Sequence, residues 1–395
     1  MRRPILFYSA WPLGYHNLEA ERKAQALARA GYDVTYVAGV GIRNPALSNL
    51  PKLIDRASRV LDRHRSKPDS DGGGAHPAGQ LPGLREGAVI VAPPRQYAAM
   101  RRLNSAWLAR QMRRQVEPWS ETLAWIRWPT PELVDALPRL APAWVVYEAV
   151  DAYAATPGSV GRGAAILARY ERLLVERADL VVVPGERLAE RYRAWGATVR
   201  VIPHGVDLVE WHGRTGSAGE RIVVGFVGTI DSRLDIPVLR TIARAHPQWR
   251  LRLIGPVQDG FDRGALADLS NVSIEPAVPA AQVPSLLTSF DLGVMPYLDH
   301  PNTTHMTPVK NLEYMAAGTP AVARRVPALE PYAGLLYFAD SPQEFVSKLE
   351  QALAEQSPER AGARRRTAER HGWPERLSEV TAIAAELTGG PCCDP

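Results

Sequence analysis

The sequence predicts an α/β protein with two doubly wound parallel sheets, and three observations lead to that fold class. The chain has 395 residues, a length that suits two or three domains. Short apolar runs of strand length alternate with helical patterns, which is typical of parallel sheets covered by helices. The alternation stops near residue 205 and starts again after a polar segment at 213–220, so we expect two such domains.

The first run of alternating elements begins at the N-terminus, where Ile5–Ser9 is interpreted as a first strand rather than a signal peptide. Helix Leu18–Arg29 follows and ends at Gly31, a residue suited to a helix C-terminus. Further helices are expected at Arg101–Gln115 and Ile166–Glu176. The other expected strands are Val34–Val37, Ala88–Val91, Thr122–Ile126, Trp144–Tyr147, Leu180–Val183 and Val199–Ile202.

The second run restarts with the strand Ile222–Val227, and the last helix begins after a break at Gly372 to Pro374. Such a break allows that helix to change direction and return to the first domain. We therefore expect an N-terminal domain at 1–205, a second domain at 206–372, and a returning helix with tail at 373–395. The remaining strands of this run are expected at Arg250–Ile254, Val272–Ile274, Leu292–Met295, Ala321–Ala323 and Leu335–Tyr337.

Two segments of the first domain stand apart in composition. Residues 62–87 are rich in glycine and charge, so we expect a mobile surface loop there. The Asp69-Ser70-Asp71 motif within it lacks the rigid support that a metal site needs. Residues 95–114 hold six arginines and no acid. Met100, Leu103 and Trp107 form an apolar stripe there, which is predicted to pack on the core, with docking on anionic lipid or phosphate as the alternative.

Charge and cysteine content narrow the class of protein. Residues 1–119 carry 19 Lys and Arg against 9 Asp and Glu, whereas residues 120–395 carry 28 against 33. The N-terminal part is thus basic, and no aromatic-basic module typical of nucleic-acid binding accompanies it. The adjacent Cys392 and Cys393 are the only cysteines, so a disulfide-stapled fold and a cysteine zinc site are excluded. We expect a cytoplasmic protein.

The most informative motif is the helix expected after Thr307, which is predicted to be its N-cap, with Pro308 in the first turn. Lys310 and Glu313 are three residues apart and share a face near the helix N-terminus. Lysine suits a phosphate, and a carboxylate suits a ribose diol. An ordinary capped helix with an exposed Lys–Glu pair would give the same pattern.

A second candidate site follows the strand at Ile222–Val227. Gly228 ends that strand and lets the backbone approach a ligand closely. Arg233 follows within reach of the same strand end. A glycine turn alone is weak support, but its position on the first strand of the second domain is where such sheets bind ligands.

The first domain offers fewer candidates. Gly14 and His16 lie in the loop after the first strand, where His16 could serve as an acid, a base or a sugar ligand. Asp151 follows the strand Trp144–Tyr147, so it is a candidate for substrate hydroxyls or general base work. Each has an ordinary alternative, a loop histidine and a helix-capping aspartate.

Together these motifs resemble the retaining glycosyltransferases of the GT-B fold, in the large group 1 (GT4-like) class, and particularly those of teichuronic acid and surface polysaccharide synthesis. The resemblance is most specific from Asp291 through Lys310 and Glu313 to Pro320, and extends to Gly225–Gly228 and Ile202–Asp207. It implies two Rossmann-like domains facing across a cleft, with the donor in the second.

The resemblance also implies residue roles. Glu313 would bind the nucleotide ribose, Lys310 and Arg233 the diphosphate, and backbone at Val278 the base. Gly14 and Gly228 would approach the diphosphate from either side. His305 stands where this class usually has a glutamate, and with Thr307 it would contact the donor sugar. Asp151 and His16 would contact acceptor and sugar as the catalytic candidates.

The implied activity is transfer of a sugar from a nucleotide-diphosphate donor, a UDP-sugar, to a glycan, lipid-linked or small-molecule acceptor. It implies no cofactor and no metal, because cationic side chains would stabilise the leaving diphosphate. Basic residues 95–114 suggest peripheral attachment to the inner face of the membrane, and no nucleic-acid partner is expected. A nucleotide-sugar epimerase or hydrolase, or a non-catalytic nucleotide-binding protein, remains open.

Overall fold

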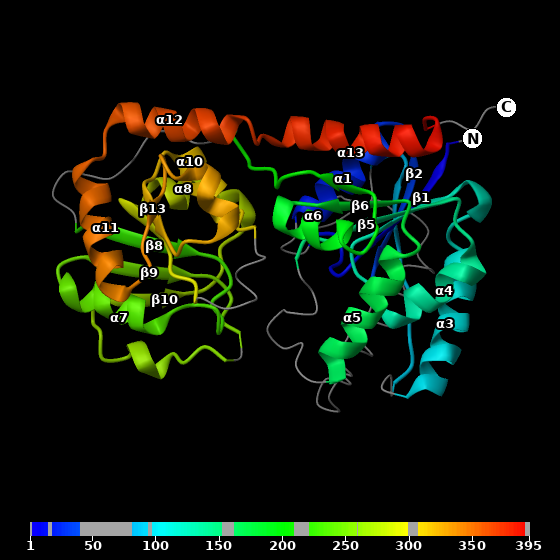
Figure 1. Cartoon of the computed structure of the whole chain (residues 1–395), viewed down its shortest axis with the longest axis horizontal. Helices are drawn as coiled ribbons and strands as arrows, with labels where there is room; N and C mark the ends of the chain where they lie inside the picture. The colour runs from blue at the N-terminus through cyan, green and yellow to red at the C-terminus, as the bar shows by residue number, and fades with distance from the viewer. Residues whose placement is uncertain are drawn as a thin grey trace, which may run out of the picture.

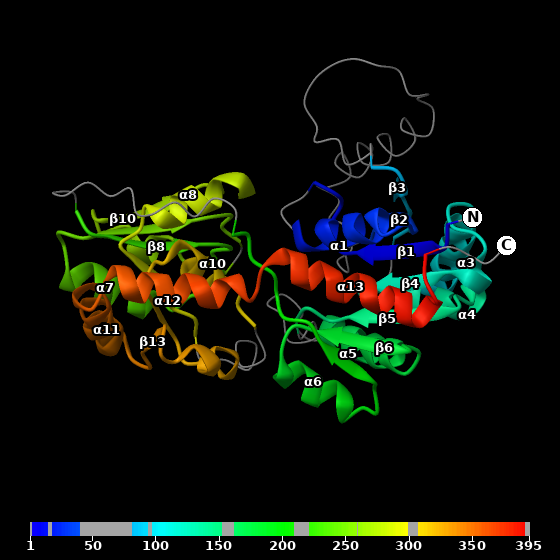
Figure 2. The same cartoon turned by 90° about the horizontal axis from the view of Figure 1, so that it is seen from above.

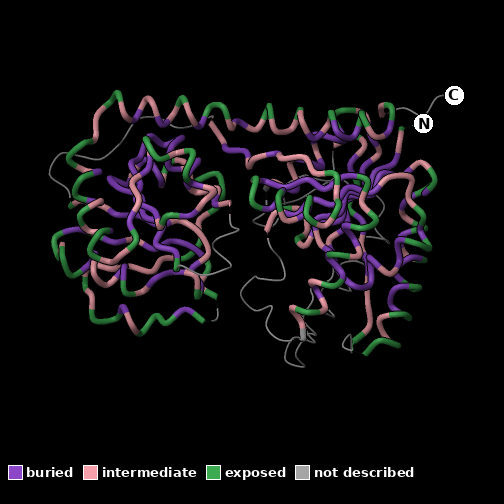
Figure 3. The backbone as a smooth tube through the Cα atoms, in the orientation of Figure 1, coloured by how far each residue is buried: buried purple, intermediate pink, exposed green. Residues whose placement is uncertain are grey.

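The computed structural model describes residues 2–14, 18–39, 81–93, 97–151, 162–208, 221–258, 260–298 and 307–391. These residues form two domains, each with one parallel β-sheet between helices (Figure 1). Most strand residues are buried or half-buried, and most exposed residues lie on the surrounding helices and turns (Figure 3). This architecture confirms the α/β class with two doubly wound parallel sheets that the sequence predicts.

The first domain contains a seven-stranded sheet in the order β3-β2-β1-β4-β5-β6-β7. The chain adds β2 and β3 on one side of β1 and then adds β4 to β7 on the other side. The strand order therefore reverses between β1 and β4. The strands are β1 (Pro4–Ser9), β2 (Asp33–Ala38), β3 (Leu84–Gly87), β4 (Leu123–Ile126), β5 (Trp144–Glu148), β6 (Leu180–Val183) and β7 (Val199–Val201).

Alternate residues of these strands face two separate cores, as the period of a strand requires. Ile5 and Phe7 of β1 pack beneath α1 and α13, whereas Leu6 and Tyr8 pack beneath the helices of the opposite face. The helices are α1 (Leu18–Arg29), α3 (Ala98–Arg113), α4 (Pro131–Leu140), α5 (Arg162–Val175), α6 (Glu186–Arg193) and α13 (Trp373–Thr388).

The second domain has a six-stranded sheet in the order β10-β9-β8-β11-β12-β13. Its strands are β8 (Val223–Val227), β9 (Arg250–Ile254), β10 (Val272–Glu275), β11 (Leu292–Met295), β12 (Ala321–Ala323) and β13 (Tyr337–Phe338). Its order reverses between β8 and β11. The helices are α7 (Ile236–Ala245), α8 (Val283–Thr288), α10 (Lys310–Ala317), α11 (Pro342–Ala354) and α12 (Pro358–Glu369).

The two domains are joined by an interdomain connection of two adjacent segments, residues 203–208 and 370–372. The Val206 N–H donates to the carbonyl of His371 over 2.9 Å, and Val206 forms a parallel bridge with Gly372. α12 and α13 run one after the other along both domains (Figure 1 and Figure 2). Val380 and Ile383 of α13 thereby complete the core beneath α1.

The third strand differs from the sequence-based expectation. The strand expected at Ala88–Val91 lies instead at Leu84–Gly87. These residues belong to the segment 62–87 that was predicted as a loop. The part of that segment at 62–80 lies outside the described residues. The backbone of residues 88–92 pairs instead with side chains of α3 and of Gln115, which follows that helix. Gln115, Gln111 and Asn104 each bond to both the N–H and the carbonyl of one residue, respectively Ala88, Ile90 and Ala92.

The apolar stripe on α3 was also predicted wrongly. Leu103 is 65% exposed and Trp107 is 42% exposed, so neither packs on the core. The face of α3 that meets the domain carries Leu108 and Met112, with Asn104 and Ser105 beside them. Helical periodicity predicts which residues share a face, but not which face is buried. Here the Asn104 side chain faces the domain, because it forms its hydrogen bonds with the backbone of residue 92. Leu103 and Trp107 therefore face outward.

Candidate functional site

The candidate site lies at the carboxyl ends of β8 and β11, where the strand order of the second sheet reverses. Open parallel sheets bind ligands at such a point because neighbouring loops there diverge to opposite faces. Gly228 directly follows β8, and its φ of +147° is a conformation that favours glycine. The next strand in the sheet, β9, is followed by Gly255, and a methyl group there would lie 2.0 Å from the carbonyl oxygen of Gly228. The two turns are therefore in direct backbone contact.

Lys310 reaches this turn from the first residue of α10. A methyl group added to Gly228 would lie 2.2 Å from Cε of Lys310 and 2.5 Å from its Nζ. The ammonium also lies 5.6 Å from the ring centroid of Phe226 in β8. The structure thus brings together Gly228 and Lys310, which are 82 positions apart in sequence, and places a cation at the sheet's reversal point.

Glu313 lies one turn further along α10 and is half-buried. Burial raises the pKa of the Glu313 carboxyl above its ordinary value, while Lys310 opposes the rise and Asp207 adds to it. Asp207 and His204, which also acts on Glu313, belong to the interdomain connection. Glu313 therefore lies within electrostatic range of the segment that joins the two domains.

The start of α10 differs from the sequence-based expectation. The helix begins at Lys310, its N-cap is Val309, and no side chain caps it. Thr307 is not the cap. Its Oγ1 lies instead 2.7 Å from where a methyl group on Gly185 would be, at the start of α6 in the first domain. Thr307 thus contacts the first domain, which a sequence-local capping rule does not anticipate.

Arg233 lies in the same loop region after β8, but it has an acidic partner of its own. Its Nη2 donates to Oδ2 of Asp231 over 2.7 Å, and its Nε lies 3.0 Å from Oδ1 of the same carboxylate. Burial alone would lower the pKa of Arg233, but Asp231 raises it, and Asp151 of the first domain adds to the rise. Asp231 therefore offsets much of the positive charge expected from Arg233, and Asp151 acts on it from across the domains.

Val278 follows β10, at the same edge of the sheet as Gly228. It is half-buried and packs against the core of the second domain. The neighbouring turns are tied together, since the Gly255 N–H donates to the carbonyl of Glu275 over 3.0 Å. β10 is the edge strand on the β8 side of the reversal point. Val278 is therefore separated from β11 by the width of three strands.

The first domain contributes Gly14 and Asp151 at the carboxyl ends of β1 and β5. Gly14 has a φ of +75°, and a methyl group there would meet no heavy atom within 4 Å. Its N–H donates to Oε2 of Glu21 over 2.9 Å, so this donor already has an acceptor in α1. His16 and His305 lie outside the described residues, as does the Asp69-Ser70-Asp71 motif.

A buried charge cluster at the carboxyl ends of β4 and β5 was not anticipated. Glu148 is 2% exposed and accepts from Lys23 and from the Trp125 indole, each over 2.7 Å. Arg127 lies 3.0 Å from the same carboxylate, and Lys23 also bonds Glu19 over 2.6 Å. Burial alone would raise the pKa of Glu148, but Arg127 and Lys23 together hold it below its ordinary value. Glu148 is therefore paired within the fold.

The same cluster holds the interdomain connection to α1. His204 Nδ1 lies 3.0 Å from Glu19, and Arg22 donates to Asp207 over 2.7 Å. Arg22 also stacks 5.0 Å above the ring centroid of Trp373, at the start of α13. The only sequence signal for this arrangement was the carboxylate at the end of a buried strand, because the partners are far apart along the chain.

The described residues contain neither a metal-binding cluster nor a membrane-spanning helix. Within those ranges, no three or more His, Cys, Asp or Glu side chains are grouped as a metal site would require. In the same part of the chain, no helix has both the length and the apolar character to cross a membrane.

Part of the second domain is similar to known proteins. Residues 221–355 match the family model described as glycosyl transferases group 1. A protein of Bacillus subtilis (strain 168), named "Putative teichuronic acid biosynthesis glycosyltransferase TuaH", is 30% identical over 146 residues. That match covers 35% of this chain and 37% of the relative, so the chain aligns with about a third of that protein's length.

Solved structures resemble the whole fold. Anabaena Alr3699/HepE in complex with UDP-glucose has a TM-score of 0.66 at 14% identity, covering 97% of this chain and 100% of that chain. TarM has a TM-score of 0.65 at 10% identity, covering 98% and 99%. The lipopolysaccharide outer core galactosyltransferase WaaB has a TM-score of 0.61 at 12% identity, covering 97% and 99%. At these identities the similarity concerns the fold, which is GT-B.

Proposed function

From a GT-B fold whose second domain matches the group 1 glycosyltransferases, we propose that this chain is a retaining glycosyltransferase. It transfers a sugar from a nucleotide-diphosphate donor, a UDP-sugar, to a glycan, lipid-linked or small-molecule acceptor. The observation that carries the proposal is the position of Lys310 against Gly228 at the reversal point of the second sheet. A phosphate bound at that turn would meet an ammonium and a glycine backbone together.

In this proposal Glu313 accepts hydrogen bonds from the ribose hydroxyls and Lys310 binds the diphosphate. Lys310 stabilises the negative charge that develops on the leaving diphosphate, so no metal ion is needed for that step. Arg233 contributes a smaller share, because Asp231 already accepts its hydrogen bonds. Backbone at Val278 meets the base, while His305 and Thr307 contact the donor sugar.

The acceptor side belongs to the first domain. We assign Asp151 and His16 to acceptor and sugar contacts, and Gly14 to the diphosphate. The electrostatic interaction between Asp151 and Arg233 supports this assignment, since it links a strand end of the first domain to the donor loop of the second. The acceptor hydroxyl attacks on the face from which the diphosphate leaves, which retains the anomeric configuration without a protein nucleophile.

Relatives support the class of donor and acceptor. HepE has been solved with UDP-glucose, and the pneumococcal O-GlcNAc transferase GtfA with UDP and GlcNAc. TuaH is named for teichuronic acid biosynthesis. We therefore propose a role in surface polysaccharide synthesis, carried out in the cytoplasm at the inner face of the membrane.

The first test is thermal stabilisation by UDP, GDP, dTDP and ADP, each measured with and without EDTA. A nucleotide that binds only the folded protein stabilises it by about 2.7 kcal/mol at 100 times its Kd. We expect a selective shift with UDP that Glu313→Ala abolishes. No shift with any of the four nucleotides would refute the donor site described here, and a shift that EDTA removes would refute metal independence.

The second test separates transfer from the alternative activities. UDP-sugars that stabilise the protein are incubated with and without a membrane-lipid extract, and UDP release is measured alongside the configuration of the product. Transfer with retention is expected only when the acceptor is present. Equal release without acceptor would indicate a hydrolase, conversion of the sugar itself would indicate an epimerase, and binding without turnover would indicate a nucleotide-binding protein.

A further inference from the structure

Helix α3 has an outer face of unusual composition. Every exposed residue of α3 and of its C-terminal cap is alanine, leucine, tryptophan or arginine. Leu103 and Trp107, one turn apart, lie beside Arg110 and Arg114 on one stripe. Within the described part of the chain, five large apolar side chains are exposed, and three of them are Tyr97, Leu103 and Trp107. The exposed apolar surface is thus concentrated on this helix.

An ordinary surface helix turns its apolar side toward the core and a polar side toward solvent. α3 buries Leu108 and Met112 in the core but also exposes Leu103 and Trp107 on its outer side. Its uncharged polar residues face the domain, where Asn104 and Gln111 bond to the backbone of residues 92 and 90 over 2.8 to 3.0 Å. Leu103 and Trp107 face away from the domain and contribute little to its core. Their exposure therefore calls for a partner outside the fold.

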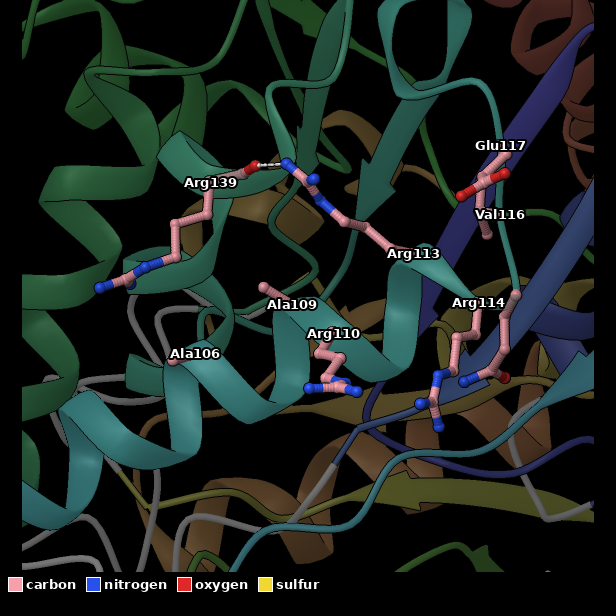
Figure 4. Close-up of a pocket in the computed structure, with 9 residues that line it drawn as sticks. Ala106, Ala109, Arg110, Arg113, Arg114, Val116, Glu117 and Arg139 are labelled. Atoms are coloured by element: carbon pink, nitrogen blue, oxygen red, sulfur yellow. Dashed lines mark hydrogen bonds between the residues drawn. The ribbon is translucent and has the colours of Figure 1, made fainter.

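The charge on this surface has one sign. α3 contains no acidic residue, and Arg102, Arg110 and Arg114 are all exposed. Near its C-terminus a groove of about 950 Å³ is lined by Arg110, Arg113, Arg114 and Arg139, with Glu117 as the only acid among the lining residues. Figure 4 shows Arg110 and Arg114 projecting away from the helix, whereas Arg113 turns to donate to the carbonyl of Arg139.

We propose that the outer face of α3 docks on an anionic phospholipid bilayer. Leucine and tryptophan insert at the headgroup boundary, and the flanking arginines bind lipid phosphates along the same stripe. The alanines between them let the helix approach the surface closely. An acidic protein partner would match the charge as well, but the mixture of tryptophan, leucine and arginine without any uncharged polar side chain suits a lipid interface better than a polar protein surface.

The position of α3 gives this docking a direction. α3 and α4 lie at the end of the first domain away from the second domain, so the surface is open (Figure 1 and Figure 2). α3 follows β3 and α5 follows β5, so both helices begin on the side where the strands have their carboxyl ends. The exposed Leu103 lies in the first half of α3, near that side. Resting on the proposed function, this orientation would present the acceptor side of the domain to a lipid-linked substrate.

The test is co-sedimentation of the purified chain with vesicles, without donor or acceptor. Vesicles of phosphatidylcholine containing roughly one third phosphatidylglycerol are compared with pure phosphatidylcholine. We expect binding to the anionic vesicles that weakens as salt is added. Arg102, Arg110 and Arg114 are replaced together by Gln, and loss of these charges should weaken binding about fivefold per arginine, or about 100-fold in total. Replacing Leu103 and Trp107 together by Ser should weaken it at least about tenfold.

A matched control removes the same charge elsewhere. Arg221, Arg263 and Arg366 are exposed residues of the second domain, and their joint replacement by Gln should leave vesicle binding within about twofold of wild type, since only charges near the vesicle surface contribute. An equal loss in this control would refute the proposal, because net charge alone would then explain binding. Absence of binding to anionic vesicles would also refute it, as would capture of an acidic protein or RNA through these arginines without vesicle binding.

The α3 variants also separate this inference from the proposed function. Their stabilisation by UDP should equal that of the wild type, because α3 lies in the first domain, away from Lys310 and Glu313. Retained UDP binding with lost vesicle binding supports the docking surface. Vesicle binding in a protein that no nucleotide stabilises would support docking and refute the donor site.

Discussion

The side chain of Lys310 lies against the α-carbon of Gly228. Glycine is the one residue type at position 228 that leaves room for the lysine side chain. A methyl group at Gly228 would lie 2.2 Å from Cε of Lys310, and the φ of +147° is strained for any residue with a β-carbon. A lysine and a turn from opposite halves of the second domain thus depend on each other.

We therefore expect Gly228→Ala to weaken UDP binding by about tenfold or more, because it displaces the ammonium that contacts the diphosphate. Calorimetric titration measures the change. Gly334→Ala is the matched control, since a methyl group there meets nothing within 4 Å and its φ is not positive. Unchanged affinity in Gly228→Ala would show that Lys310 does not bind the diphosphate from this position.

The carboxylate of Asp231 offsets the charge of Arg233, so Asp231→Asn should strengthen diphosphate binding. Asparagine keeps the shape of the side chain while the region gains one positive charge. We expect UDP affinity to rise about fivefold, a change of about 1 kcal/mol. Asp268→Asn, which alters the same charge beside Arg240 and Arg244 at an exposed site, should have no effect. Weaker binding in Asp231→Asn would instead indicate that Asp231 positions Arg233 for the ligand.

The raised pKa of Glu313 predicts a pH dependence of nucleotide binding. When the pH falls through that pKa, the carboxyl gains a proton and loses an acceptor for the ribose hydroxyls, so affinity should fall toward acid. Titrations from about pH 8 to pH 5 compare the wild type with Glu313→Gln, in which this step should be missing. Both proteins share the titration of UDP itself, and identical profiles would argue against the ribose contact.

The buried carboxylates of the first domain predict acid sensitivity of the fold. Despite burial, nearby cations hold the pKa values of Glu19 and Glu148 below the ordinary 4.5. As the pH falls, these carboxyls take up protons in the unfolded chain at a higher pH than in the folded protein. The stability that they provide above pH 4.5 is therefore lost as the pH falls through their folded-state pKa values.

Glu148→Gln should cost about 3 kcal/mol at neutral pH, because Lys23 and Arg127 lose their buried counter-charge. Its stability should also change less with acid than that of the wild type. Urea unfolding at a series of pH values measures both effects. A neutral-pH loss below about 1 kcal/mol would contradict the view that this cluster is a buried, paired network.

The contact between Gly205 and Trp373 predicts the effect of crowding the interdomain connection. A methyl group at Gly205 would lie 2.5 Å from a carbon of the Trp373 indole, which Arg22 covers on one face. Gly205→Ala should destabilise the protein by about 1 to 3 kcal/mol. Thermal unfolding is the measurement, and Gly205→Ala combined with Trp373→Leu should recover part of the loss. If the double variant is no more stable than Gly205→Ala, the clash lies elsewhere.

The spacing of local patterns predicted several elements of both domains. The helix Leu18–Arg29 matches the structure residue for residue, and β9 and β11 match as well. Lys310 and Gly228 come together as expected, because both sit at ends of elements whose order in a parallel α/β sheet is restricted. The expected cap at Thr307 was wrong, since that side chain contacts the first domain instead.

What the sequence determined by itself was the fold class, the order of the elements and the residues that gather at the strand ends, because strand and helix periods and turn residues act over short distances. Tertiary structure decided which partner each charge meets and which face of a helix is covered. Arg233 is paired by Asp231, Glu148 by Lys23 and Arg127, and Leu103 and Trp107 are turned outward by the inward bonds of Asn104 and Gln111. Burial and ion pairing depend on neighbours far along the chain, and a periodic pattern carries no information about which of its faces they will cover.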